Sequence, residues 1–175
     1  MVTINLAYTA PVNPAGASPA LTQSQVWAGL QLKVRRAQDF VPVIEGCAVL
    51  SEDLEPGTGN ARVVREVQFA DEDKDGKGEE GGRRRRRTVR ETCVHYAPCR
   101  VVFEQPDGST VTNVVGRGPD GELLLSYVFE WRHPDVEEGS ARARELEEGH
   151  WKVAKMAVES SIDSIRRFVQ EGKIQ

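Results

Sequence analysis

The sequence contains few residues of the kinds that build disulfide frameworks or metal centres. Its 175 residues include only three cysteines and three histidines: Cys47, Cys93, Cys99, His95, His133 and His150. Neither set has the spacing of a disulfide framework or a zinc site. The sequence also shows no site for a nucleotide, flavin or metal. We therefore predict free thiols, no metal and no cofactor.

Long apolar runs and an excess of basic charge are also lacking. No window approaches the roughly 20 apolar residues of a membrane-spanning helix, and the first 16 residues lack the basic and apolar regions of a secretory signal. The 23 basic residues face 27 acidic ones, a net charge of −4, which disfavours a general nucleic-acid or membrane-surface binder. The sequence predicts one soluble cytoplasmic domain over residues 1–175.

Hydropathy patterns predict the order strand, helix, six strands, helix. Residues 2–9 alternate with the period of a half-buried strand. Thr22 and Gln25 have the spacing of a capping box at the start of a helix over 23–36, and a turn or short helical piece follows. The six further strands are predicted over 43–51, 61–69, 88–96, 100–105, 110–116 and 122–132.

Turns and a long final helix define the expected fold. Pro106-Asp107-Gly108 and Pro119-Asp120-Gly121 predict short hairpins, hence an antiparallel sheet. Beyond Ser140, a plausible N-cap, apolar residues recur every three or four positions until Gly172. A long helix with one apolar face needs the sheet to cover it. We predict an α+β fold in which a curved, seven-stranded antiparallel sheet wraps around the C-terminal helix.

Several polar residues fall on the apolar face of the predicted sheet. Strand alternation assigns six to this face: Arg65, Glu91, Cys93, His95, Asn113 and Tyr127. Burying such groups is costly unless they are paired or face water, so a cavity between sheet and helix would suit them. Alternatively, Arg65 and Glu91 form a simple ion pair on adjacent strands and His95 lies at the edge of the core. The sequence leaves both interpretations open.

Two motifs have simple structural explanations. Residues 116–121 spell G-x-G-x-x-G, but a strand follows where the dinucleotide fingerprint needs a helix, so we predict a hairpin turn. Arg83 to Arg87 follow an acidic, glycine-rich stretch, and we interpret 71–87 as a flexible, solvated loop. The alternative is a nucleic-acid or nuclear-import element, although no aromatics interleave with the arginines.

Blocks spread along nearly the whole chain together resemble one family. They are residues 21–22 (LT), 27–30 (WAGL), Lys33, Arg36, 40–42 (FVP), 89–92 (VRET), 118–123 (GPDGEL), 127–134 (YVFEWRHP) and 151–162 (WKVAKMAVESSI). On these blocks the chain resembles the fungal AtaL-like group of the START/Bet v1-like (SRPBCC) superfamily, apart from the long 71–87 segment. The resemblance implies a helix-grip fold with a hydrophobic cavity between the sheet and the C-terminal helix. It also implies a role in fungal secondary metabolism.

The first functional hypothesis is an enzyme. Superfamily members bind lipids, hormones or polyketides, and some catalyse cyclisation, dehydration or isomerisation without a cofactor. His95 or Glu91 would serve as acid or base, Tyr127 would donate to a carbonyl or enolate oxygen, and Arg65 would stabilise negative charge. The ligand would contact Phe103, Asn113, Phe129, Trp131, Trp151 and Met156.

The second hypothesis is a carrier or sensor. Such a protein binds an apolar small molecule through the same wall of large side chains and needs no particular acid or base. The polar residues on the inward face favour the enzyme only modestly, because a carrier of an oxygenated ligand would also need them. The sequence does not identify the ligand, the reaction or the oligomeric state.

Overall fold

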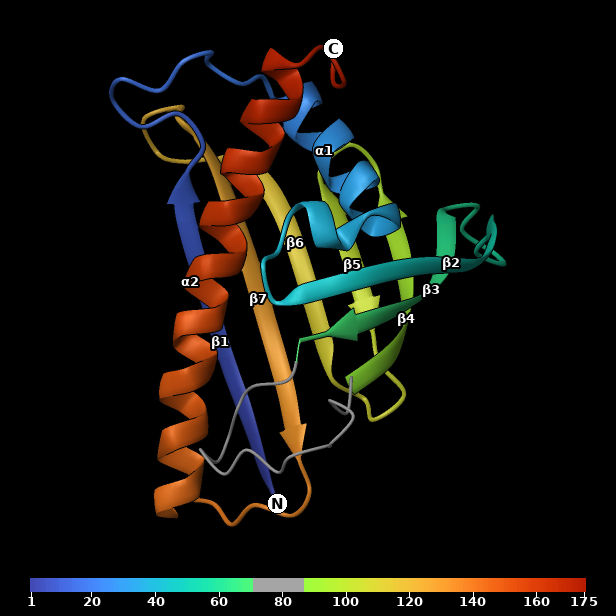
Figure 1. The fold of residues 1–175 in the computed structure, drawn as a ribbon, viewed down its shortest axis with the longest axis vertical. Coiled ribbons are helices and arrows are strands. Elements are labelled where there is room, and N and C mark those ends of the chain that lie inside the picture. The colour runs from blue at the N-terminus through green and yellow to red at the C-terminus, as the bar shows by residue number, and fades with distance from the viewer. Residues whose placement is uncertain (71–86) are drawn as a thin grey trace, which may run out of the picture.

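The computed structural model describes residues 1–70 and 87–175. Its strands pair antiparallel in one sheet with the order β1-β7-β6-β5-β4-β3-β2. In chain order the elements are β1 (Val2–Pro11), α1 (Gln23–Arg35), the 3-10 helix η1 (Ala37–Asp39), β2 (Ile44–Leu54), β3 (Ala61–Phe69), β4 (Arg87–Tyr96), β5 (Arg100–Glu104), β6 (Thr110–Arg117), β7 (Leu123–His133) and α2 (Ala141–Gln170). Figure 1 shows this arrangement. The predicted order of elements and the predicted α+β helix-grip architecture are confirmed.

Both α-helices begin at the predicted caps. The Thr22 Oγ1 accepts a hydrogen bond from the Gln25 backbone N–H (3.2 Å), and the Gln25 side chain accepts one from the Thr22 N–H (2.9 Å). At the start of α2, the Ser140 Oγ accepts from the Ala143 N–H at 3.1 Å. These contacts satisfy backbone donors that a helix leaves unpaired in its first turn.

The hairpins also form where the turn residues predict them. Gly108 joins β5 to β6 with φ of 84°, and Gly121 joins β6 to β7 with φ of 80°. This left-handed region suits glycine, which has no Cβ to clash with the backbone. The G-x-G-x-x-G segment is therefore part of a hairpin, as expected, and no helix follows it.

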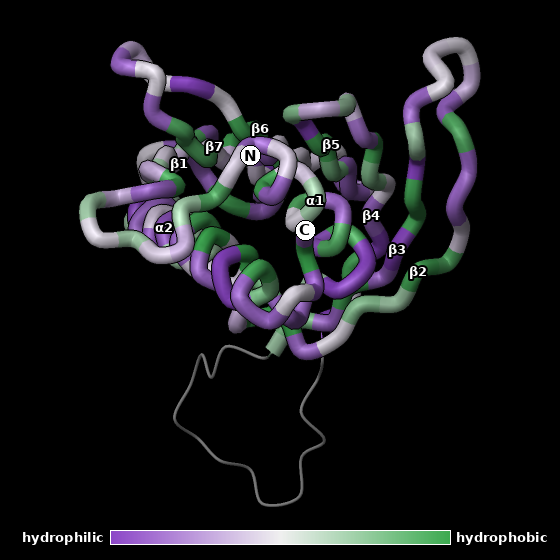
Figure 2. The backbone as a smooth tube through the Cα atoms, turned by 90° about the horizontal axis from the view of Figure 1, so that it is seen from above, coloured by the Kyte–Doolittle hydropathy of each residue, from purple (hydrophilic) through white to green (hydrophobic). Residues whose placement is uncertain are grey.

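The sheet curves around the two helices. Figure 2 shows the molecule from above: the strands form an arc from β1 to β2, and α1 and α2 lie on its concave side. α2 packs on β1 and β7, whereas α1 packs against β2, β3, β6 and α2. The close approach of α1 to α2 depends on Gly29, because a Cβ there would run into the side chain of Ile165. The buried core residues lie between the arc and these helices.

Element ends differ slightly from the prediction. β1 continues to Pro11, α1 ends at Arg35, and β2 runs on to Leu54. Most β2 side chains are exposed, and its register with β3 shifts at two places, so hydropathy alternation gives no signal for where β2 ends. The predicted flexible loop over 71–87 lies outside the described residues except for Arg87, the first residue of β4. Over residues 1–70 and 87–175, no helix is long and apolar enough to cross a membrane.

Candidate functional site

One row of inward-facing side chains carries polar groups across the middle of the sheet. In the strand register His95 on β4 pairs with Val101 on β5, Val101 with Asn113 on β6, and Asn113 with Tyr127 on β7. All four residues are buried. Because adjacent strands lie about 4.8 Å apart, the Asn113 and Tyr127 side chains are neighbours, and His95 lies about 10 Å from Asn113.

In the described part of the chain, His95 has one ring nitrogen with a hydrogen-bond partner and one without. Its Nδ1 lies 3.1 Å from the carbonyl oxygen of Ala61, which can only accept, so Nδ1 carries the proton of the neutral ring. The Nε2 lone pair is buried and has no partner among the described residues. Burial lowers the pKa of His95 below its ordinary value, although the hydrogen bond to Ala61 opposes this. The neutral form therefore dominates at neutral pH, with Nε2 available as a base.

The side chains next along this row also have unpaired polar atoms. Both amide atoms of Asn113 and the hydroxyl of Tyr127 are buried without a hydrogen-bond partner in the described parts of the chain. Ser161 on α2 lies close to Tyr127; its hydroxyl donates to the Ala157 carbonyl at 2.6 Å, which leaves the Ser161 oxygen as an acceptor beside the Tyr127 hydroxyl. Burial raises the pKa of Tyr127, so its phenol remains a hydrogen-bond donor. These atoms can bind oxygen groups of a ligand.

Arg65 and Glu91, by contrast, satisfy one another. The Arg65 Nε and Nη2 donate to the Glu91 Oε2 at 2.9 and 2.6 Å, and the Gln105 amide donates to the Glu91 Oε1 at 3.0 Å. The Arg65 Nη1 donates to the carbonyl oxygens of Lys33 and Val34, both at 3.0 Å. The structure therefore shows the ion pair on adjacent strands that the sequence allowed. The pair joins β3, β4 and the end of α1.

Lys33 is the inward-facing charge that sequence reasoning missed. Its ammonium nitrogen lies 4.0 Å from the Tyr127 ring centroid and 5.5 Å from that of Phe103. Burial lowers its pKa to about 7, helped by the charge of Arg65 and opposed by Glu91. The signal was the helical spacing, because Lys33 lies three positions after Leu30 and so shares its apolar face.

Cys93 is also on the inward face, where burial makes its thiol a poor nucleophile. Burial raises the pKa of its thiol to about 12, so the thiolate is scarce at neutral pH. Within the described residues, no group of three or more His, Cys, Asp or Glu is arranged to hold a metal ion.

Aromatic rings extend from this polar row towards the C-terminal end of β7. Phe129 lies 6.3 Å from Tyr127 between ring centroids, and Trp131 stacks on Phe129 at 4.4 Å. His150 of α2 stacks on Trp131 at 4.0 Å. Phe103 and Phe129 are buried in the core, and Trp131 and Met156 are partly buried against it. The predicted ligand-contacting residues that lie on the inner side of the sheet are Phe103, Asn113, Phe129, Trp131 and Met156.

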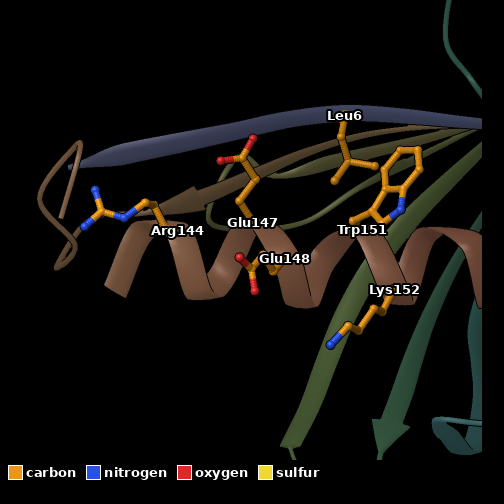
Figure 3. Close-up of a pocket in the computed structure, with 6 residues that line it drawn as sticks. All are labelled: Leu6, Arg144, Glu147, Glu148, Trp151 and Lys152. Atoms are coloured by element: carbon orange, nitrogen blue, oxygen red, sulfur yellow. The ribbon is translucent and has the colours of Figure 1, made fainter. Parts of the chain in front are cut away.

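Trp151 lies elsewhere. Its side chain is 50% exposed and meets Tyr8 edge to face, with ring centroids 5.6 Å apart. Trp151 lies on the side of α2 that faces β1. Because β1 is the edge strand of the sheet, no further strand within residues 1–70 and 87–175 covers Trp151. Trp151 instead lines a surface pocket of about 640 Å³, together with Leu6, Arg144, Glu147, Glu148 and Lys152 (Figure 3).

Comparison with known proteins decides the family. A family model described as Acetylaranotin biosynthesis cluster protein L (AtaL) matches residues 6–172. The chain belongs to the AtaL family. A protein of that name from Aspergillus terreus (strain NIH 2624 / FGSC A1156) is 28% identical over 173 residues, which cover 99% of this chain and 94% of the relative. The resemblance seen in the sequence blocks is confirmed.

Solved structures place this AtaL family member in a wider set of similar folds. The Zhui aromatase/cyclase from Streptomyces sp. R1128 superposes with a TM-score of 0.60 at 18% identity, over 96% of each chain. The KanY protein gives a TM-score of 0.60 at 13% identity, over 94% of this chain and 99% of that one. Ara h 8.0201 gives 0.53 at 10% identity, over 97% and 98%. At these identities the likeness concerns the fold alone.

Proposed function

We propose that this protein binds an apolar small molecule carrying oxygen groups, and that it promotes cyclisation, dehydration or isomerisation of that molecule. The observation that supports this best is the row of buried, unpartnered polar atoms on His95, Asn113 and Tyr127. Leaving such atoms unpaired costs about 1–3 kcal/mol for each group, which a ligand would recover by pairing with them. The names of the relatives, a biosynthesis cluster protein and an aromatase/cyclase, support a polyketide-like intermediate as the ligand.

In this proposal each inward-facing side chain has its own role. His95 takes a proton through Nε2, Tyr127 donates to a developing carbonyl or enolate oxygen, and Asn113 orients the ligand. Phe103, Phe129, Trp131 and Met156 supply apolar contact. Arg65 and Glu91, assigned to chemistry from the sequence, act instead by holding β3, β4 and α1 in place, because their own hydrogen bonds are already made.

A matched pair of probes tests whether the site recognises oxygen. We expect 2-naphthol to bind roughly fivefold more tightly than naphthalene, because its hydroxyl can pair with one of the unpartnered atoms and a single hydrogen bond contributes about 1 kcal/mol. Affinities can be measured by displacement of a fluorescent naphthalene-sulfonate dye. Equal affinities for the two probes would favour a carrier that recognises apolar shape alone.

The protonation of His95 gives a second test. Nitrogen-detected NMR titration should find its pKa below the usual value near 6.5, with the proton on Nδ1 at neutral pH. Because a base works only when unprotonated, catalysis should be constant at neutral pH and fall as the pH drops through this lowered pKa. A normal or raised pKa, or a proton on Nε2, would remove His95 as the base.

The carrier remains the second candidate, since its apolar contacts are the same. Native mass spectrometry of the freshly purified protein, followed by analysis of any released compound, separates the two functions. A carrier should release a bound compound unchanged after incubation, and Trp131→Ala should weaken its retention. An enzyme should convert a precursor of that compound, and the conversion should fall at least tenfold in His95→Ala.

A further inference from the structure

We propose that Lys33 is a nucleophile that forms an imine with a carbonyl group of the bound ligand. This inference rests on the proposed function, because it requires that the ligand enters the interior of the sheet. It also narrows the ligand class to ketones, aldehydes or poly-β-ketones. Neither the sequence motifs nor the family description assigns this role to Lys33.

The position of the amine supports the proposal. Lys33 is buried on the concave side of the sheet, and its Nζ lies over the rings of Tyr127 and Phe103. These rings belong to β7 and β5, so the amine stands above β6, the strand that carries Asn113. The unpartnered amide of Asn113 and hydroxyl of Tyr127 therefore lie on the same part of the inner face. A carbonyl oxygen bound by them would bring its carbon close to the amine.

Electrostatics supply the reactive form of the amine. No carboxylate in the described part of the chain pairs with Lys33, and Arg65 adds a repelling positive charge. With a pKa of about 7, roughly half of the amine is neutral at pH 7, which is about a thousandfold more than for a lysine of ordinary pKa near 10.4. Desolvation of this kind, next to another cation, is a known way to activate a lysine towards carbonyl substrates.

The reaction balances with groups that the structure holds. The Nζ lone pair attacks the carbonyl carbon, and a proton passes from nitrogen to the former carbonyl oxygen to give a carbinolamine. The Tyr127 hydroxyl then relays a proton, giving its own to the leaving hydroxyl as it takes the N–H proton, so that water leaves and no free tyrosinate forms. The sum is amine plus carbonyl giving imine plus water. No oxidant or reductant is needed.

A small β-diketone tests the proposal without knowledge of the natural ligand. We expect 2,4-pentanedione to modify the full chain at neutral pH, with a mass gain of one diketone minus one water and the near-ultraviolet absorbance of a conjugated enaminone. Peptide mapping should place the adduct on Lys33. Lys33 should be labelled at least roughly tenfold faster than the exposed Lys155. The larger neutral fraction of the Lys33 amine outweighs the loss of nucleophilicity that comes with its lower basicity.

Two variants serve as controls. Lys33→Arg keeps the charge over the Tyr127 ring but should lose the adduct, whereas Lys155→Arg should keep it. If Lys33→Arg fails to fold, the mapping on the unsubstituted chain still decides the question. If 2-naphthol binds but labelling is absent, or is equally fast at all lysines, the imine proposal is wrong and the proposed function stands. Failure of both naphthol binding and labelling overturns both.

Discussion

Replacing Glu91 by alanine should lower the free energy of unfolding by about 3–5 kcal/mol. The substitution leaves the Arg65 guanidinium charged and almost fully buried, with side-chain exposure of only 4%, and it removes the acceptor for both Arg65 and Gln105. A buried charge without its partner is among the most destabilising features that a single substitution creates. Urea unfolding followed by tryptophan fluorescence measures the change.

Matched variants separate the burial of this pair from the mere presence of a salt bridge. Arg62 and Asp53 form an exposed pair between β2 and β3, with an N–O distance of 2.7 Å. Asp53→Ala should leave the unfolding midpoint nearly unchanged, because exposed pairs contribute little. The double variant Arg65→Met/Glu91→Leu should recover most of the lost stability, since an apolar pair avoids desolvation. If Glu91→Ala shifts the midpoint no more than Asp53→Ala, Glu91 is free for chemistry after all.

The inner face of the sheet could be predicted from sequence because strand geometry is simple. Side chains alternate between the two faces of a strand, so Val63, Arg65 and Val67 share one face. Because the two valines are buried, Arg65 is predicted to point inward with them. The same rule places His95, Asn113 and Tyr127 inward. It does not say that the last two are neighbours. That fact comes from cross-strand pairing, which depends on the length and geometry of each hairpin.

Other parts of the site could not be found this way. A lysine near the apolar stripe of a helix usually extends its stem along the surface and keeps its ammonium in water. Lys33 is buried because its ammonium reaches the rings of Tyr127 and Phe103 on the sheet, which is a tertiary contact. Trp151 shows the opposite case. Its helical spacing matches the buried stripe of α2, but the sheet ends at β1 and leaves it half exposed.

Replacing Asn113 by leucine should make the protein more stable and less able to bind oxygenated ligands. Asn113 is fully buried, and its amide has no partner in residues 1–70 and 87–175. Leucine has a similar branched shape and no polar atoms, so the free energy of unfolding should rise by about 1–3 kcal/mol. The affinity for 2-naphthol should fall roughly fivefold, to the level of naphthalene, because one ligand hydrogen bond of about 1 kcal/mol is lost. Stability and binding then change in opposite directions.

That opposition distinguishes a binding group from a structural one. If a polar residue is retained for stability, replacing it lowers both the stability of the protein and its affinity for the ligand. If it is retained for function, it destabilises the unliganded protein, so replacing it raises the stability. Asn5 on β1 is the matched control, because it is exposed and Asn5→Leu should change the free energy of unfolding by no more than about 0.5 kcal/mol. Naphthol affinity should be unchanged in it. An Asn113→Leu protein that is less stable but binds 2-naphthol normally would show that Asn113 belongs to the framework, and the recognition of oxygen would then rest on His95 and Tyr127 alone.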